Sequence, residues 1–156
     1  MLAIDAGTGS CRALLFTTAG AQVSVSQREW VHREPPGVPG GQDFDVHANW
    51  SAIAACVQDA LWQAGADGKQ VLAVASTSMR EGIVLYDELG AEIWACPNVD
   101  SRAMTEAEEL ISEGAAERIY KEAGDWVAIT SPARLRAAVT SLSQNASRYQ
   151  RIAMPQ

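Results

Sequence analysis

The sequence lacks the features of disulfide-rich, zinc-binding and membrane-spanning proteins. Its three cysteines, Cys11, Cys56 and Cys96, are widely spaced and form no C-x-x-C pair. This pattern predicts neither a disulfide framework nor a zinc site, and it favours a reducing compartment. No apolar run is long enough to cross a bilayer, and no basic region precedes an apolar signal core. We therefore expect a cytoplasmic protein with no membrane partner.

Basic residues are also scarce. The chain has 12 Lys and Arg against 19 Asp and Glu, which gives a formal net charge of −7. An acidic surface repels phosphate backbones, so we expect no nucleic-acid partner, and any phosphate ligand must be held locally. The 156 residues are 47% hydrophobic, which is enough for one domain with its own core.

The first part of the chain predicts an antiparallel meander. Residues 2–4 are apolar and strand-like, residues 6–10 are small and turn-prone, and residues 12–16 predict a returning strand. Clean alternation over residues 22–26 predicts a third strand. Asp5 is therefore expected at the tip of the first strand.

The turn after Asp5 has the composition of a phosphate-binding hairpin. Gly7 and Gly9 permit backbone angles closed to other residues and let a ligand approach the main chain closely. Thr8, Ser10 and the backbone N–H groups offer donors to phosphate oxygens. The turn has neither the P-loop nor the Rossmann pattern. The turn alone therefore supports a phosphate site and an ordinary surface hairpin equally.

The middle of the chain predicts a loop, a helix and a parallel strand. Residues 33–42 are rich in Pro and Gly and predict an irregular loop. Asp45 is a plausible N-cap of a helix that ends near Gly65. Its predicted buried face comprises Trp50, Ile53, Ala54, Val57 and Leu61. The apolar run 71–75 predicts a parallel strand buried on both faces.

The last third predicts a hairpin and helices. Residues 83–94 read as two strands around a turn, Thr105 and Glu108 as a capping box, and residues 115–123 as a helix closed by Gly124. All acidic residues lie at or before Asp125, whereas residues 134–156 carry four arginines. We expect this tail to be poorly packed or only partly helical.

Four segments of the chain resemble the FGGY carbohydrate kinases. They are Asp5–Arg12, Asp43–Asp45 with Trp50, Ser76–Gly82 and Trp94–Ala103. Within this family the motifs most resemble those of the autoinducer-2 kinase branch. Xylulose, rhamnulose and glycerol kinases share most of the same scaffold. The resemblance implies an α/β fold: an incomplete ribonuclease H-like (actin-like ATPase) domain, whose mixed sheet has an antiparallel three-stranded start and covering helices.

The resemblance also implies roles for individual residues. Thr8, Gly9, Ser10 and Arg12 would approach the phosphates of ATP, and Asp5 would act through Mg²⁺ or its waters. Arg80 and Glu81 would hold the hydroxyls of a small polyol or sugar-like substrate, with Asp100 as a further cleft residue.

Simpler structural roles remain open for the same residues. Arg80 and Glu81 could be an exposed ion pair, and Asp100 an N-cap. His32 and His47 are expected to be surface or capping residues. The five tryptophans, Trp30, Trp50, Trp62, Trp94 and Trp126, are expected to be core or loop-anchoring residues.

The resemblance covers residues 1–135 and ends where the basic tail, residues 136–156, begins. We expect this tail to reflect a truncation, a frameshift or a fragment. The family's catalytic aspartate lies beyond residue 156, so no catalytic residue is predicted. The leading hypothesis is therefore the N-terminal portion of a sugar or polyol kinase that is inactive alone. The alternatives are a non-catalytic remnant that binds weakly or self-associates as a homo-oligomer, and an actin-like ATPase of another branch.

Overall fold

The computed structural model describes residues 1–128 and 130–152, with side chains described as far as Ser143. The chain divides into two compact units. The first comprises residues 1–33, 43–82 and 97–99, and the second comprises residues 34–42, 83–96 and the chain from Asp100 onward. Each unit is described by itself.

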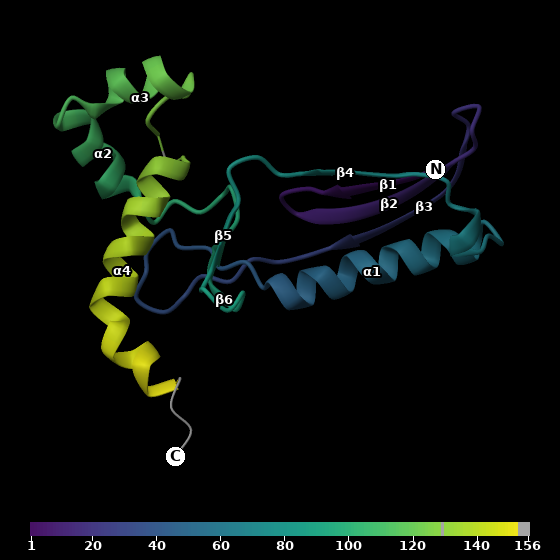
Figure 1. The fold of residues 1–156 in the computed structure, drawn as a ribbon, viewed down its shortest axis with the longest axis horizontal. Helices are drawn as coiled ribbons and strands as arrows, with labels where there is room; N and C mark the ends of the chain where they lie inside the picture. Colours follow the sequence, from purple (N-terminus) through teal and green to yellow (C-terminus); the bar gives the residue numbers. More distant parts are fainter. Residues whose placement is uncertain (129, 153–156) are drawn as a thin grey trace. The chain divides into compact units, whose positions relative to one another are not determined.

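The first unit is built on a four-stranded mixed sheet (Figure 1). Its strands are β1 (Leu2–Ala6), β2 (Ser10–Phe16), β3 (Gln22–Glu29) and β4 (Val74–Ser78), in the order β3-β2-β1-β4. The pairs β1–β2 and β2–β3 are antiparallel, whereas β4 runs parallel to β1. The predicted meander and the predicted parallel strand are both confirmed.

Helix α1 (Val46–Gln63) covers one face of this sheet, over β2 and β3. Asp45 is its N-cap, as predicted, and its Oδ1 accepts a hydrogen bond from Ala48 N at 2.9 Å. The core between helix and sheet contains Leu2, Cys11, Ala13, Leu15, Trp30, Cys56 and Ala60. Alternate residues of β2 face the helix because successive side chains of a strand point to opposite sides.

The prediction that Trp50 lies on the buried face of this helix is wrong. Trp50 is 68% exposed, whereas the buried positions of α1 are Asn49, Cys56 and Ala60. Trp50 follows Asn49 by one position and is therefore rotated by about 100° from it around the helix axis. Ile53, Val57 and Leu61 do pack against the core, as predicted.

The three thiols are buried and free. Cys11 Sγ lies 3.7 Å from Cys56 Sγ. Burial is the main cause that raises the pKa of the Cys11 thiol to about 11, and the contact with Cys56 is the second cause. Burial, together with the nearby Asp100 carboxylate, also raises the pKa of the Cys96 thiol to about 11.

Because the thiolate is the reactive form, we expect the folded protein to resist thiol reagents at pH 8. An aromatic disulfide reagent should label none of the cysteines in buffer and all of them in concentrated urea. Fast labelling of any thiol in the folded chain would contradict this expectation.

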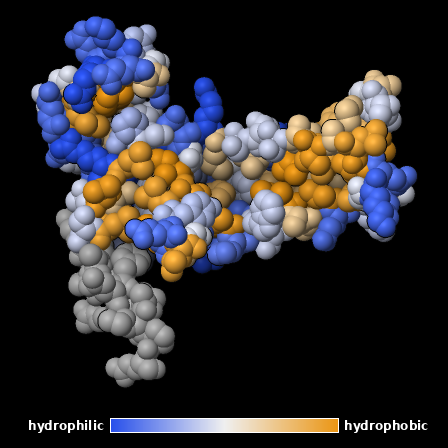
Figure 2. Space-filling view, in the orientation of Figure 1, coloured by the Kyte–Doolittle hydropathy of each residue, from blue (hydrophilic) through white to orange (hydrophobic). Residues whose placement is uncertain are grey.

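Strand β4 differs from its prediction in burial. The apolar run 71–75 does lead into a parallel strand, but the strand begins at Val74, after the 3₁₀ turn η1 (Gly68–Gln70). Leu72 is 75% exposed and Val74 is 60% exposed. Among the described strands none pairs with the outer edge of β4, and α1 packs over β2 and β3 instead. Figure 2 shows an apolar area at the right of the view, over the end of the first unit where β4 begins.

The second unit contains a hairpin and helices. Strands β5 (Ile83–Tyr86) and β6 (Glu92–Cys96) pair antiparallel, as predicted. The helices that the structure describes here are α2 (Met104–Ser112), α3 (Ala115–Ala123) and α4 (Ser131–Ile152). Gly124 ends α3, as predicted, and its φ is 72°. The predicted capping box of Thr105 and Glu108 is wrong. Thr105 lies inside α2, whose N-cap, Ala103, makes no side-chain hydrogen bond.

The basic tail is more helical, as far as the structure describes it, than its composition predicts. Helix α4 runs without a break through Ile152, so the tail is helical as far as the structure describes it. Arg136 of α4 contacts Glu109 at 3.2 Å and Glu113 at 2.8 Å. The hydrogen bond from Arg136 lowers the pKa of Glu113. The acidic α2 and the basic α4 are therefore electrostatically complementary, although they lie apart in the sequence.

Candidate functional site

The turn between β1 and β2 is tight on one side and open on the other. Gly7 N donates to the Ser10 carbonyl at 2.8 Å, and a Cβ at Gly7 would lie 3.3 Å from that oxygen. A Cβ at Gly9 would meet nothing within 4 Å. Neither glycine has a positive φ, so the turn does not use the left-handed angles that glycine permits. Close packing explains Gly7, and open space lies beside Gly9.

The carbonyls of this turn are held by the segment after β3. The Thr8 carbonyl accepts hydrogen bonds from Trp30 Nε1 at 3.0 Å and from His32 Nε2 at 2.7 Å. The Gly9 carbonyl accepts one from Trp30 N at 3.1 Å. In a trans peptide the next N–H points opposite to the carbonyl. The N–H groups of Gly9 and Ser10 therefore point away from residues 30–32.

The side chain of Thr8 is also positioned. Its Oγ1 donates to Asn98 Oδ1 at 3.0 Å, which ties the turn to residues 97–99 of the same unit. The hydroxyl oxygen keeps acceptor capacity.

Asp5 and Arg12 face each other across β1 and β2. They are direct partners in the strand register, and Arg12 Nε donates to Asp5 Oδ2 at 3.1 Å. Their side chains are 27% and 49% exposed, respectively. Such a partly exposed pair adds little stability and leaves both charges accessible to a ligand.

The residues around Asp5 fit a metal ion only in a limited way. Among the described residues, no group of three or more His, Cys, Asp or Glu could hold a metal ion. Mg²⁺ is commonly bound through one or two carboxylates together with phosphate oxygens and water. Asp5 therefore fits a Mg²⁺ ion that arrives with a phosphate ligand.

Arg80 and Glu81 lie at the same edge of the sheet as this turn. They follow the carboxyl end of β4, which is parallel to β1, and Met79 N donates to the Ala6 carbonyl at 2.8 Å. Ligands of open α/β sheets bind outside the carboxyl ends of the strands. Glu81 has φ 65°, and among the described residues no other non-glycine residue has a positive φ.

Asp100 belongs to the second unit and is enclosed there. Its side chain is fully buried, and Oδ2 accepts from Gln42 N and from Arg102 Nε, both at 2.6 Å. Its Oδ1 accepts from Arg102 N at 3.2 Å. The buried Arg134 donates to its carbonyl at 2.9 Å. Asp100 thus fastens the loop 34–42 and α4 to the start of the segment that leads into α2.

Some of these contacts could not be predicted from the sequence. His32, expected to be a surface or capping residue, contacts the turn instead, because Trp-x-His places both rings on one side of an extended segment. Trp30 anchors the turn, as expected. Arg102 lies 5.4 Å from the ring of Trp94. The expected core or anchoring role is wrong for Trp62, which is 83% exposed. Trp126 is 71% exposed, and the one ring contact that it makes among the described residues is with Tyr120.

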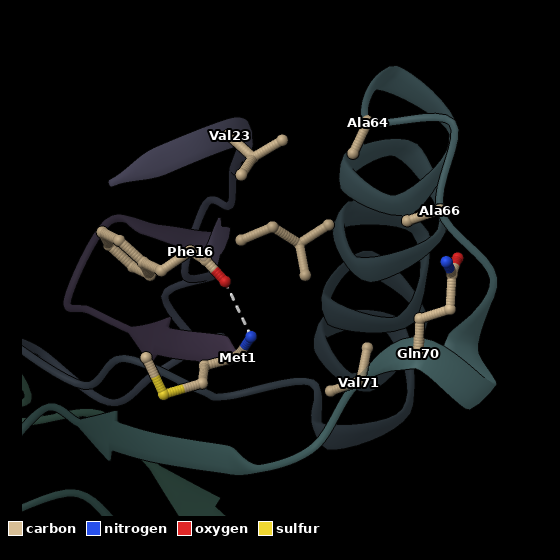
Figure 3. A pocket seen from close by; sticks show the side chains of 8 residues that line it. Met1, Phe16, Val23, Ala64, Ala66, Gln70 and Val71 are labelled. Carbon is tan, nitrogen blue, oxygen red and sulfur yellow. Dashed lines mark hydrogen bonds between the residues drawn. The ribbon is translucent and has the colours of Figure 1, made fainter. Parts of the chain in front are cut away.

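A separate hollow of about 130 Å³ lies at the other end of the first unit (Figure 3). Its lining is mostly apolar and comes from the strands and from the chain after α1: Met1, Leu15, Phe16, Val23, Ala64, Ala66, Gln70 and Val71. The amino group of Met1 donates to the Phe16 carbonyl at 2.8 Å. None of these lining side chains is charged. None of the described helices is both long and apolar enough to cross a bilayer.

The family of this chain follows from comparison with known proteins. The sequence profile of the FGGY family of carbohydrate kinases, N-terminal domain, matches residues 1–139. An autoinducer-2 kinase of Yersinia enterocolitica is 44% identical over 138 residues, which are 86% of this chain and 26% of the relative. The chain thus spans about a quarter of the length of the curated relatives it matches.

Solved structures show the same fold. The xylulose kinase of Rhodospirillum rubrum superposes with a TM-score of 0.75 at 25% identity, over 86% of this chain and 28% of that one. A Plasmodium falciparum glycerol kinase, solved with ADP, gives a TM-score of 0.75 at 15% identity, over 94% and 30%. The predicted actin-like ATPase fold, present here in part, is confirmed. The chain belongs to the FGGY family of carbohydrate kinases, within whose N-terminal domain it lies.

Proposed function

We propose that this chain carries the phosphate-binding turn and the hydroxyl-binding pair of an ATP-dependent kinase for a small polyol or sugar-like substrate. The observation that supports it is the common sheet edge: the parallel strands β1 and β4 bring the turn after Asp5 and the Arg80–Glu81 pair together. A cytoplasmic location belongs to the same proposal, because buried free thiols suit a reducing compartment.

In this proposal each group has a separate task. The N–H groups of Gly9 and Ser10 and the Arg12 guanidinium stabilise phosphate charge, and Thr8 holds the turn through the hydrogen bond from its hydroxyl to Asn98. Asp5 would hold Mg²⁺ directly or through water. Mg²⁺ bound with ATP supplies charge neutralisation on the phosphates. Arg80 and Glu81 orient substrate hydroxyls by charge-assisted hydrogen bonds.

Asp100 takes an indirect role in this proposal. A substrate could reach its oxygens only by replacing the donors from Gln42 and Arg102. We therefore assign Asp100 to holding the loop 34–42 and the α2 entry rather than to direct substrate contact.

The chain alone is expected to show no kinase turnover, because no described residue is placed as the base that takes the proton of the attacking hydroxyl. A coupled assay of ADP release, with ATP, Mg²⁺ and a panel of polyols, measures this. Saturable, polyol-dependent ADP release from this polypeptide would contradict the expectation.

A chimera tests the positive half of the proposal. Residues 1–139 of this chain would replace the matched segment of the Yersinia enterocolitica autoinducer-2 kinase, which shares 44% identity. We expect the chimera to phosphorylate the parent's substrate with a kcat/KM within about tenfold of the parent. A folded chimera without activity would contradict the proposal. Titration calorimetry of the chimera against xylulose, rhamnulose and glycerol would separate the autoinducer-2 branch from the alternatives.

Self-association is a second candidate, supported by the exposed edge of β4. Leu72 and Val74 expose apolar surface there, and an exposed apolar edge strand favours pairing with another chain. Gel filtration with light scattering should show a dimer or larger species that Val74→Lys shifts to monomer. A clean monomer for the unsubstituted chain would count against self-association.

A further inference from the structure

Three aromatic rings form a cluster behind the phosphate-binding turn. Trp30 and His32 follow the end of β3, and an isolated antiparallel bridge joins Arg33 to Asp43, the residue before Phe44. The Phe44 ring lies 5.6 Å from the Trp30 ring, edge-on, and 5.8 Å from the His32 ring. Phe44 thus contacts both rings, which limits the orientations in which their N–H groups can point.

We propose that His32 is a positioning residue for phosphate binding. It acts through the Thr8 carbonyl, which it holds together with Trp30 so that the N–H groups of Gly9 and Ser10 face the ligand. The inference rests on the proposed function, since it assigns a role within the same phosphate-binding turn.

The first step of the argument is the chemistry of the contact. A carbonyl oxygen only accepts hydrogen bonds, so at 2.7 Å the Nε2 atom of His32 must carry the proton. The neutral Nε2–H tautomer and the imidazolium ion both satisfy this requirement. The contact therefore depends on the ring nitrogen and not on the net charge of the side chain.

The second step is the number of donors. A carbonyl oxygen has two lone pairs, and here both are used, by Trp30 Nε1 and by His32 Nε2. Rotating the Thr8–Gly9 peptide plane would break both hydrogen bonds at once. Without His32 one bond remains, and the plane gains freedom that phosphate binding must then restrict again.

The third step is that burial favours a fixed geometry. Trp30 is 8% exposed and belongs to the core of the first unit, so its ring has little freedom. His32 is half-buried at the rim of the same cluster. Its replacement is therefore expected to alter the turn without dismantling the core.

The experiment uses the whole chain, tripolyphosphate as the probe and nuclear magnetic resonance of the Gly9 and Ser10 amides. His32→Leu removes both ring nitrogens, and His32→Gln retains a donor near the position of Nε2. The matched control is His47→Leu, because His47 is exposed on α1 and is the only other histidine of the sequence. Melting curves establish that each variant is folded.

We expect His32→Leu to weaken tripolyphosphate binding about fivefold, the usual effect of one hydrogen bond. His32→Gln should recover at least half of the loss, and His47→Leu should bind like the unsubstituted chain. Without ligand, the backbone order parameters of Gly9 and Ser10 should fall in His32→Leu from a rigid value of about 0.85.

Two different failures can be told apart. If tripolyphosphate shifts no amide of the unsubstituted chain, the phosphate-binding function itself is wrong. If it binds but His32→Leu binds equally well, or shows unchanged order parameters, the role of His32 is overturned while the proposed function stands. A loss of binding that His32→Gln does not rescue would indicate only packing and would also overturn the positioning role.

Discussion

Replacing Glu81 with glycine is expected to stabilise the chain by about 0.5 to 1 kcal/mol. Glu81 has φ 65°, in the left-handed region that costs an L-residue about 1 to 2 kcal/mol. Glycine avoids this cost but loses about 0.5 to 1 kcal/mol through its freer unfolded chain. The difference favours glycine. Urea unfolding of Glu81→Gly and of the unsubstituted chain measures it.

The same substitution is expected to damage the proposed site. In the chimera with the Yersinia enterocolitica kinase, loss of a charge-assisted hydrogen bond to a substrate hydroxyl should lower kcat/KM about 10- to 100-fold. Glu81→Gln should lose a similar part of the activity without the gain in stability, because it keeps the strained backbone.

A matched control separates the relief of backbone strain from the general effect of replacing a glutamate with glycine. Glu88→Gly lies in the exposed turn between β5 and β6, where φ is not positive, and should destabilise the chain slightly. If Glu81→Gly destabilised as much as Glu88→Gly, the strain argument would be wrong. Full activity of the Glu81→Gly chimera would remove Glu81 from the substrate site.

The position of this strained residue is informative. Glu81 follows the end of β4, at the sheet edge that also carries the turn after Asp5. Strained backbone tends to persist where the side chain has a task that the rest of the fold supports. The Arg-Glu pair predicted from sequence is thus also the place where the backbone departs most clearly from local preference.

Local patterns predicted local structure well in this chain. An apolar run, a turn-prone segment and alternation predicted the meander of β1 to β3, and Asp45 marked the start of α1, because these features depend on neighbours in sequence. The family resemblance implied ligand-binding roles for Asp5, Arg80 and Glu81, and the parallel pairing of β1 and β4 places these residues at one edge of the sheet.

Burial was predicted less well, because it depends on partners distant in sequence. The apolar run that leads into β4 reads as a buried strand, yet Val74 is exposed since α1 lies over β2 and β3. The role of His32 could not be predicted, because its partner is a carbonyl that any residue at position 8 would supply. Arg134 gave no signal of burial, since charged residues are rarely buried without a partner.

Replacing Asp100 with alanine is expected to have the largest effect on stability, about 3 kcal/mol within the second unit. The carboxylate is fully buried and accepts from Gln42 N, Arg102 Nε and Arg102 N. Removing one partner of a buried ion pair leaves the other charge uncompensated, which costs about 3 to 5 kcal/mol. Hydrogen exchange should accelerate about 100-fold in the loop 34–42, because the carboxylate holds Gln42 N, whereas the contact of Arg134 with the Asp100 carbonyl remains in the variant.

Two further variants make this expectation specific. Asp100→Asn keeps the shape but places an amide N–H group among three donors, so it should recover only a small part of the loss. The matched control is Asp59→Ala, which breaks the exposed pair with Arg28, whose side chains are 47% and 43% exposed, and should cost less than about 1 kcal/mol. If Asp100→Ala exchanged no faster than Asp59→Ala, Asp100 would not be holding the loop, and its carboxylate would be available for the direct substrate contact that the family resemblance implies.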